Sequence, residues 1–98
     1  MSGDSLAFLD ELETTIRQRA AQPSPDSYTS LLLQQGVQRI AQKVGEEAVE
    51  LALAAVAGER RQQLEEGADL LYHLLVLLTS RGLALADVVA VLESRHRR

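Results

Sequence analysis

The 98-residue sequence contains no cysteine and no tryptophan, and aromatic residues make up only 3% of it. Without cysteine the chain can form no disulfide, no thiolate zinc site and no cysteine nucleophile. Nucleic-acid binding needs basic surface and stacking rings, whereas this chain has a formal net charge of −4. We therefore expect neither cysteine chemistry nor a nucleic-acid partner.

Long apolar runs are also missing. The longest, over residues 70–78, is interrupted by Tyr72 and His73, and a membrane-spanning helix needs about 20 apolar residues. The N-terminal segment is acidic rather than basic, so it does not look like a signal peptide. We expect one domain over residues 1–98, located in the cytoplasm and without a membrane partner.

Leucine and alanine dominate the composition, and both favour helices, whereas β-branched and aromatic residues are scarce. The spacing of apolar residues therefore predicts an all-α fold. Proline and glycine positions divide the chain into four expected helices. These helices cover about residues 5–21, 27–57 with a kink at Gly36, 59–81, and 84 to the C-terminus.

Two segments, residues 51–57 and 70–78, are apolar nearly all the way round. A helix of that kind must be covered on every side, and a chain of this length can hardly cover both. We therefore expect a homo-oligomer, with a homodimer as the simplest form. In the last helix, Val88, Val89 and Leu92 are expected to face inward.

Carboxylates recur at three-residue spacing on the second and third predicted helices. Glu47 pairs with Glu50, and Glu66 pairs with Asp69, so each pair lies on one helix face. If the turn centres on Gly58, an antiparallel hairpin puts Glu50 opposite Glu66. Glu47 then lies opposite Asp69, and both couples are roughly 12 Å from the turn, at about 1.5 Å per residue.

Four carboxylates at one level repel each other unless some are protonated or a cation joins them. Oxygen ligands suit Mg²⁺ and, as a second choice, Mn²⁺. A single such pair is usually no more than a solvated helix face. Two level pairs beside the most apolar part of the chain favour the metal interpretation.

Nearby polar residues have more than one interpretation. His73 lies one turn after Asp69, and it either bonds a carboxylate, contacts substrate or is satisfied within the core. Lys43 lies one turn before Glu47, as a phosphate contact or as an ion-pair partner. No glycine-rich phosphate loop is present, so metal ions and side chains would have to hold any phosphate.

Three segments together resemble one enzyme family, the phosphoribosyl-ATP pyrophosphatases. They are Ser-Tyr-Thr at 27–29, Lys-Val-Gly-Glu-Glu-Ala-Val-Glu at 43–50, and Glu-Gly-Ala-Asp-Leu-Leu-Tyr-His at 66–73. The family belongs to the all-α, MazG-like nucleoside triphosphate pyrophosphatases. The resemblance implies a four- to five-helix bundle completed by homodimerisation. It also implies Mg²⁺-dependent hydrolysis of phosphoribosyl-ATP to phosphoribosyl-AMP and pyrophosphate, the second step of histidine biosynthesis.

The resemblance assigns metal ligation to the same four acids that the hairpin register selects. Two residues depart from the family pattern: Gly67 replaces an alanine, and Ala84 replaces a serine that caps a helix. The cyclohydrolase domain found fused to some members needs cysteine-bound zinc, and this chain has no cysteine. We therefore expect a phosphoribosyl-AMP cyclohydrolase on a separate chain.

Further roles in the expected reaction are hypotheses. The expected catalytic residues are Glu47, through the metal, and Glu46, which is a candidate to orient or deprotonate the attacking water. The expected substrate-binding residues are Arg19, Ser27, Thr29, Arg39, Lys43 and His73.

Two other functions stay open at this point. A MazG-like housekeeping pyrophosphatase would share the metal site and act on ordinary or damaged nucleoside triphosphates. A non-catalytic helical dimerisation module would have the same acids as a solvated face.

Overall fold

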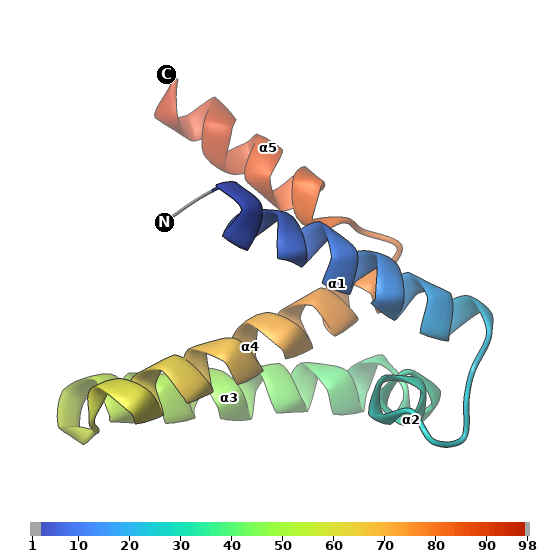
Figure 1. Ribbon diagram of the computed structural model, residues 1–98, viewed down its shortest axis with the longest axis horizontal. Coiled ribbons are helices and arrows are strands. Elements are labelled where there is room, and N and C mark those ends of the chain that lie inside the picture. The colour runs from blue at the N-terminus through green and yellow to red at the C-terminus, as the bar shows by residue number, and fades with distance from the viewer. Residues whose placement is uncertain (1–2, 98) are drawn as a thin grey trace.

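The computed structural model describes residues 3–97, which form five α-helices and no strand. The helices are α1 (Gly3–Ala21), α2 (Tyr28–Gln35), α3 (Val37–Ala57), α4 (Arg60–Ser80) and α5 (Leu85–His96). The expected all-α class is therefore confirmed. The antiparallel hairpin of α3 and α4 forms one arm of a V, and α1 and α5 form the other arm (Figure 1).

The predicted helix over residues 27–57 is divided at Gly36 into α2 and α3. Gly36 has φ +94°, a backbone conformation that glycine adopts without steric cost. Ser27 caps the start of α2, because its Oγ accepts a hydrogen bond from the backbone N–H of Ser30 at 3.2 Å. The expected kink is thus a complete break, and Figure 1 shows α2 end-on beside α3.

A small apolar core joins the first four helices where the two arms meet. Segment 70–78 contributes two of its five fully buried side chains. The fully buried core side chains are Ile16 of α1, Leu32 of α2, Ile40 of α3, and Leu75 and Val76 of α4.

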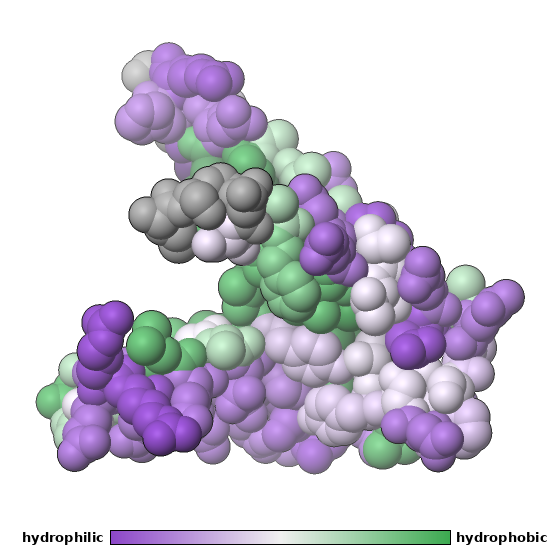
Figure 2. Space-filling view, viewed as in Figure 1, coloured by the Kyte–Doolittle hydropathy of each residue, from purple (hydrophilic) through white to green (hydrophobic). Residues whose placement is uncertain are grey.

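Other apolar side chains remain uncovered within the single chain. In segment 51–57, Leu53 is 65% exposed and Val56 is 89% exposed. The prediction that α5 turns Val88, Val89 and Leu92 inward is wrong, because all three are exposed and α5 contains no buried residue. Helical periodicity predicts which side chains share a face, but not whether anything packs against that face. Figure 2 shows apolar surface in the angle between the arms and on the hairpin arm.

A carboxylate from the first helix anchors the last one. The Leu85 N–H, at the start of α5, donates a hydrogen bond to Glu13 Oε2 at 2.7 Å. Glu13 is buried and forms an ion pair with Arg17 at 3.0 Å. The hydrogen bond from Leu85, followed by the nearby guanidinium, holds the pKa of Glu13 below its usual value. At the same helix start, the Ala84 N–H donates to Asp87 Oδ2 at 2.9 Å.

No single helix within residues 3–97 is both long and apolar enough to cross a membrane. The pair α4 and α5 meets those two criteria only when both helices are counted together, and they are bent by 104° relative to each other.

Candidate active site

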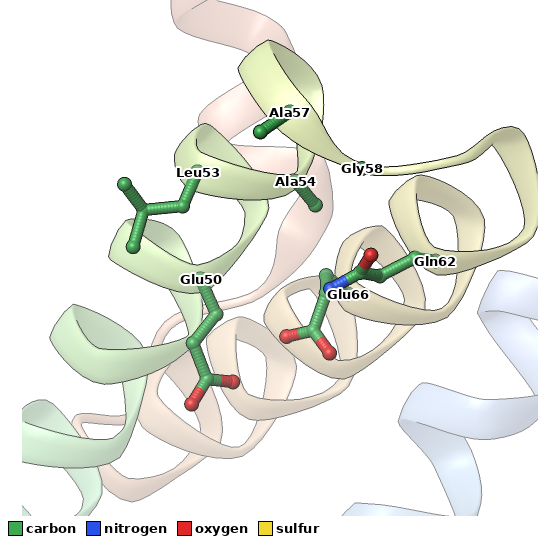
Figure 3. Close-up of a pocket in the computed structure, with 7 residues that line it drawn as sticks. All are labelled: Glu50, Leu53, Ala54, Ala57, Gly58, Gln62 and Glu66. Atoms are coloured by element: carbon green, nitrogen blue, oxygen red, sulfur yellow. The ribbon is translucent and has the colours of Figure 1, made fainter.

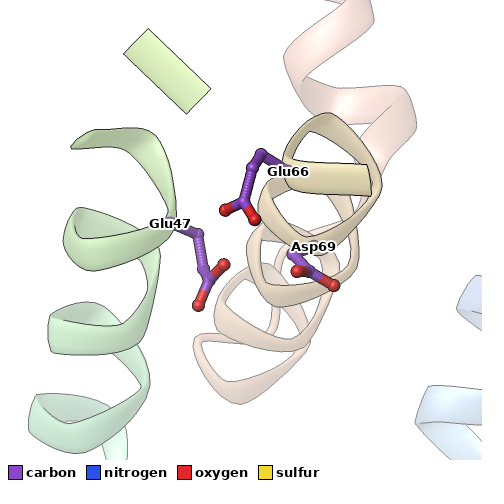
Figure 4. Close-up of side chains that lie close together, drawn as sticks. All are labelled: Glu47, Glu66 and Asp69. Carbon is purple, nitrogen blue, oxygen red and sulfur yellow. The ribbon is translucent and has the colours of Figure 1, made fainter. Parts of the chain in front are cut away.

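Three carboxylates converge between the two helices of the hairpin. Glu47 projects from α3, and Glu66 and Asp69 project from α4 (Figure 4). One carboxylate oxygen from each lies within 4.8 Å of the others. Glu47 is buried, Glu66 is half-buried and Asp69 is exposed. The cluster is therefore fixed at one side and open to solvent at the other.

Glu50 of α3 faces Glu66 from the side nearer the turn (Figure 3). Their contact raises the pKa of Glu66 to about 6, first through a hydrogen bond that requires a shared proton, then through desolvation and repulsion by the neighbouring acids. Glu66 Oε2 is itself buried, and within residues 3–97 no protein group donates to it. The hairpin register thus brings Glu50 beside the three converging acids, and an unsatisfied carboxylate oxygen lies among them.

Lys43 lies at the other side of the cluster, on α3. Its Nζ is 3.4 Å from Glu47 Oε1 and 3.8 Å from Glu46 Oε1. The other oxygen of Glu46 accepts a hydrogen bond from Gln42 Nε2 at 3.0 Å. Glu46 therefore contacts Lys43 and Gln42 and lies beside the three converging acids rather than among them.

Two of the expected substrate-binding hydroxyls make hydrogen bonds within the protein. Ser27 caps α2, and Thr29 Oγ1 is hydrogen-bonded to the Tyr72 hydroxyl of α4. Tyr28 lies between these two residues in the sequence, and its ring stacks with the ring of Tyr72, with the two ring centroids 6.2 Å apart. This segment therefore fastens α2 to the helix that carries Glu66 and Asp69.

His73 is buried, and both of its ring nitrogens have partners. Nδ1 lies 2.7 Å from the Asp69 carbonyl oxygen, which can only accept, so Nδ1 carries a proton. In the neutral ring, Nε2 then accepts a hydrogen bond from the Tyr28 hydroxyl at 3.1 Å. Of the three interpretations of His73, the satisfied core histidine describes the structure. Spacing gave no indication of Tyr28 as its partner, because the two residues come from different helices.

The two remaining predicted substrate contacts lie apart from the acids. Arg39 is exposed one turn before Lys43 on α3, and Arg19 is exposed in the last turn of α1. Within residues 3–97 neither arginine forms an ion pair.

A cavity of about 560 Å³ adjoins the acids on the side of the turn (Figure 3). Two of the acids form part of its wall, and most of the other lining residues are small or apolar. The lining residues are Glu50, Leu53, Ala54, Ala57, Gly58, Gln62 and Glu66.

Comparison with known proteins identifies the family of the chain. Residues 9–96 match the family described as phosphoribosyl-ATP pyrophosphohydrolase. The chain is 55% identical over 93 residues to the phosphoribosyl-ATP pyrophosphatase of Pyrobaculum arsenaticum, and 57% identical to that of Pyrobaculum aerophilum, in each case over 99% of the relative. It is 58% identical over 90 residues to the histidine biosynthesis bifunctional protein HisIE of Xylella fastidiosa, but spans only 44% of that longer protein. The chain belongs to the phosphoribosyl-ATP pyrophosphohydrolase family.

Proposed function

We propose that this domain hydrolyses the α–β phosphoanhydride bond of phosphoribosyl-ATP, giving phosphoribosyl-AMP and pyrophosphate in the second step of histidine biosynthesis. The observation that carries the proposal is the convergence of Glu47, Glu66 and Asp69, with ligand oxygens within 4.8 Å of one another. Membership of the family and the names of the Pyrobaculum relatives support the substrate.

The residues present fit a hard divalent cation, Mg²⁺ or, as a second choice, Mn²⁺. Carboxylate oxygens are its preferred ligands, and the buried Glu66 Oε2 has no other partner. The proposed ligands are Glu47, Glu50, Glu66 and Asp69. When bound, the metal would offset charge on the departing pyrophosphate and lower the pKa of a water molecule for attack.

The protein's own groups would orient the substrate around this centre. Lys43 forms an ion pair with Glu47 and is the proposed contact for the outer phosphates, together with Arg39 one turn earlier on α3 and Arg19 in the last turn of α1. Glu46 is the proposed group that orients or deprotonates water.

Three residues expected to bind substrate fit a different role. Ser27, Thr29 and His73 already use their polar atoms within the protein, so we assign them to holding α2 against α4.

We further propose that the chain acts as a homodimer. Val49 and Val56 recur at helical spacing on α3, and both are more than half exposed. A second copy packed on this stripe would remove it from water. We also propose that the reaction takes place in the cytoplasm and that a phosphoribosyl-AMP cyclohydrolase takes over the product.

The decisive experiment measures pyrophosphate release from phosphoribosyl-ATP with and without Mg²⁺, beside ATP and a panel of other triphosphates. Glu47→Gln and Asp69→Asn should abolish turnover. Glu65→Gln is the matched control, because Glu65 is exposed next to Glu66 and is not among the converging acids. Cleavage of other triphosphates instead would indicate a housekeeping pyrophosphatase. Inactivity on every substrate would indicate a dimerisation module.

A further inference from the structure

Along the interface between α3 and α4, the residues on the two sides of the acid cluster differ in charge and polarity. On one side lies Lys43, with its Nζ 3.4 Å from Glu47. On the side of the turn lies the 560 Å³ cavity, whose wall contains no basic residue. Leu53 and Ala57 make much of this wall apolar, and Gln62 supplies its only neutral polar side chain.

From this asymmetry we propose that the cavity receives the nucleobase of the substrate, with the polyphosphate running from the acids toward Lys43. The inference builds on the proposed function, because it gives the direction in which the same substrate lies. Phosphate oxygens in the cavity would lose water beside Glu50 and Glu66 without meeting a cation, which is costly, whereas the base ring itself carries no negative charge. Its volume is also within the usual range of small-molecule sites, about 300–1,000 Å³.

The cavity and the acids are physically continuous. Glu50 and Glu66 belong to the cavity wall, and the same two side chains face each other across the hairpin (Figure 3). A ring seated in the cavity would therefore leave its sugar at this pair of carboxylates. The first phosphate would then lie at the proposed metal ligands, where the bond to be cleaved must lie.

Gln62 gives the cavity a means of recognising adenine. A glutamine amide can donate one of its N–H groups to the acceptor N7 of adenine while its oxygen accepts from the N6 donor. Figure 3 shows this amide extending from α4 toward Glu66. The amide occupies space that a side chain at position 58 would need, because a Cβ on Gly58 would lie 2.6 Å from Gln62 Oε1. Glycine at the turn thus leaves the amide free to occupy the cavity mouth.

The test uses a pair of exposed alanines in the last turns of α3. Ala57 lines the cavity and Ala55 does not, so Ala57→Leu fills the cavity and Ala55→Leu is the matched control. The readout is inhibition of turnover by each product separately, because phosphoribosyl-AMP carries the base and pyrophosphate does not. Ala57→Leu should weaken inhibition by phosphoribosyl-AMP about tenfold or more, equivalent to about 1.4 kcal/mol. Inhibition by pyrophosphate should not change in either variant.

A second variant keeps the test independent of how Ala57→Leu packs. Gln62→Ala should weaken phosphoribosyl-AMP inhibition by roughly 5- to 150-fold, the loss expected for one bidentate amide–base pair. Unchanged phosphoribosyl-AMP inhibition in both variants would overturn the inference, as would an equal loss for the two products. A change of oligomeric state alone would assign the cavity to a contact between copies and would also overturn it. A wild-type protein that does not cleave phosphoribosyl-ATP would instead refute the proposed function.

Discussion

Glu13 should hold α5 in place, and replacing it with alanine measures how strongly. Its buried carboxylate accepts the Leu85 N–H at 2.7 Å and pairs with Arg17 at 3.0 Å. A hydrogen bond to a charged group contributes about 1.5–3 kcal/mol, and alanine also leaves the Leu85 N–H without this acceptor. We expect Glu13→Ala to lower the free energy of unfolding by about 2 kcal/mol. For a domain of this size that corresponds to a fall in Tm of about 8–16 °C.

The assay is thermal and urea unfolding at one fixed protein concentration, with amide hydrogen exchange at Leu85 as a local readout. Glu13→Gln keeps an acceptor oxygen without the charge, so it should lose about half as much stability as alanine does. Glu11→Ala is the control, because Glu11 is exposed on the same helix. If the free energy of unfolding of Glu13→Ala lies within about 0.5 kcal/mol of the wild-type value, which is the ordinary range for surface substitutions, the reasoning is refuted.

Three further predictions concern pH, helix capping and the metal. Because the pKa of Glu13 is lowered in the folded state, this carboxylate stabilises the fold fully above its unfolded pKa of about 4.5, and the stabilisation is lost as pH falls through the folded value. The free energy of unfolding should therefore fall less steeply with decreasing pH in Glu13→Gln than in the wild type. Ala84→Ser should add about 1 kcal/mol in urea unfolding, because the hydroxyl would complete the capping box already half formed by Asp87. Glu66→Gln should raise Tm in EDTA by relieving carboxylate repulsion, and it should abolish the further rise that we expect Mg²⁺ to give the wild type.

The acid cluster was predictable because a single turn determines its register. Once the turn centres on Gly58, the positions of Glu47, Glu66 and Asp69 follow from the helical rise alone. The apolar composition of segment 70–78 likewise predicted that it must be covered, and Leu75 and Val76 within it are buried. Gly36 also predicted a kink, although only the backbone conformation there shows that the helix ends rather than bends.

Contacts between distant helices could not be predicted in this way. The link from Glu13 to Leu85 joins positions 72 residues apart, and the pairing of Tyr28 with His73 spans 45. Each depends on how whole helices cross, which spacing along one helix does not encode. Spacing along α4 therefore could not select among the interpretations of His73.

The confinement of the acid cluster to one hairpin also bears on the order of folding. Glu47 and Asp69 lie on consecutive helices joined by a short turn, so their approach closes a small loop. The contact from Glu13 to Leu85 must close nearly the whole chain, and such non-local contacts slow folding. We expect pulse-labelled hydrogen exchange to show the α3–α4 hairpin protected before α5. A refolding chain would then present its carboxylates to a cation before its last helix has docked.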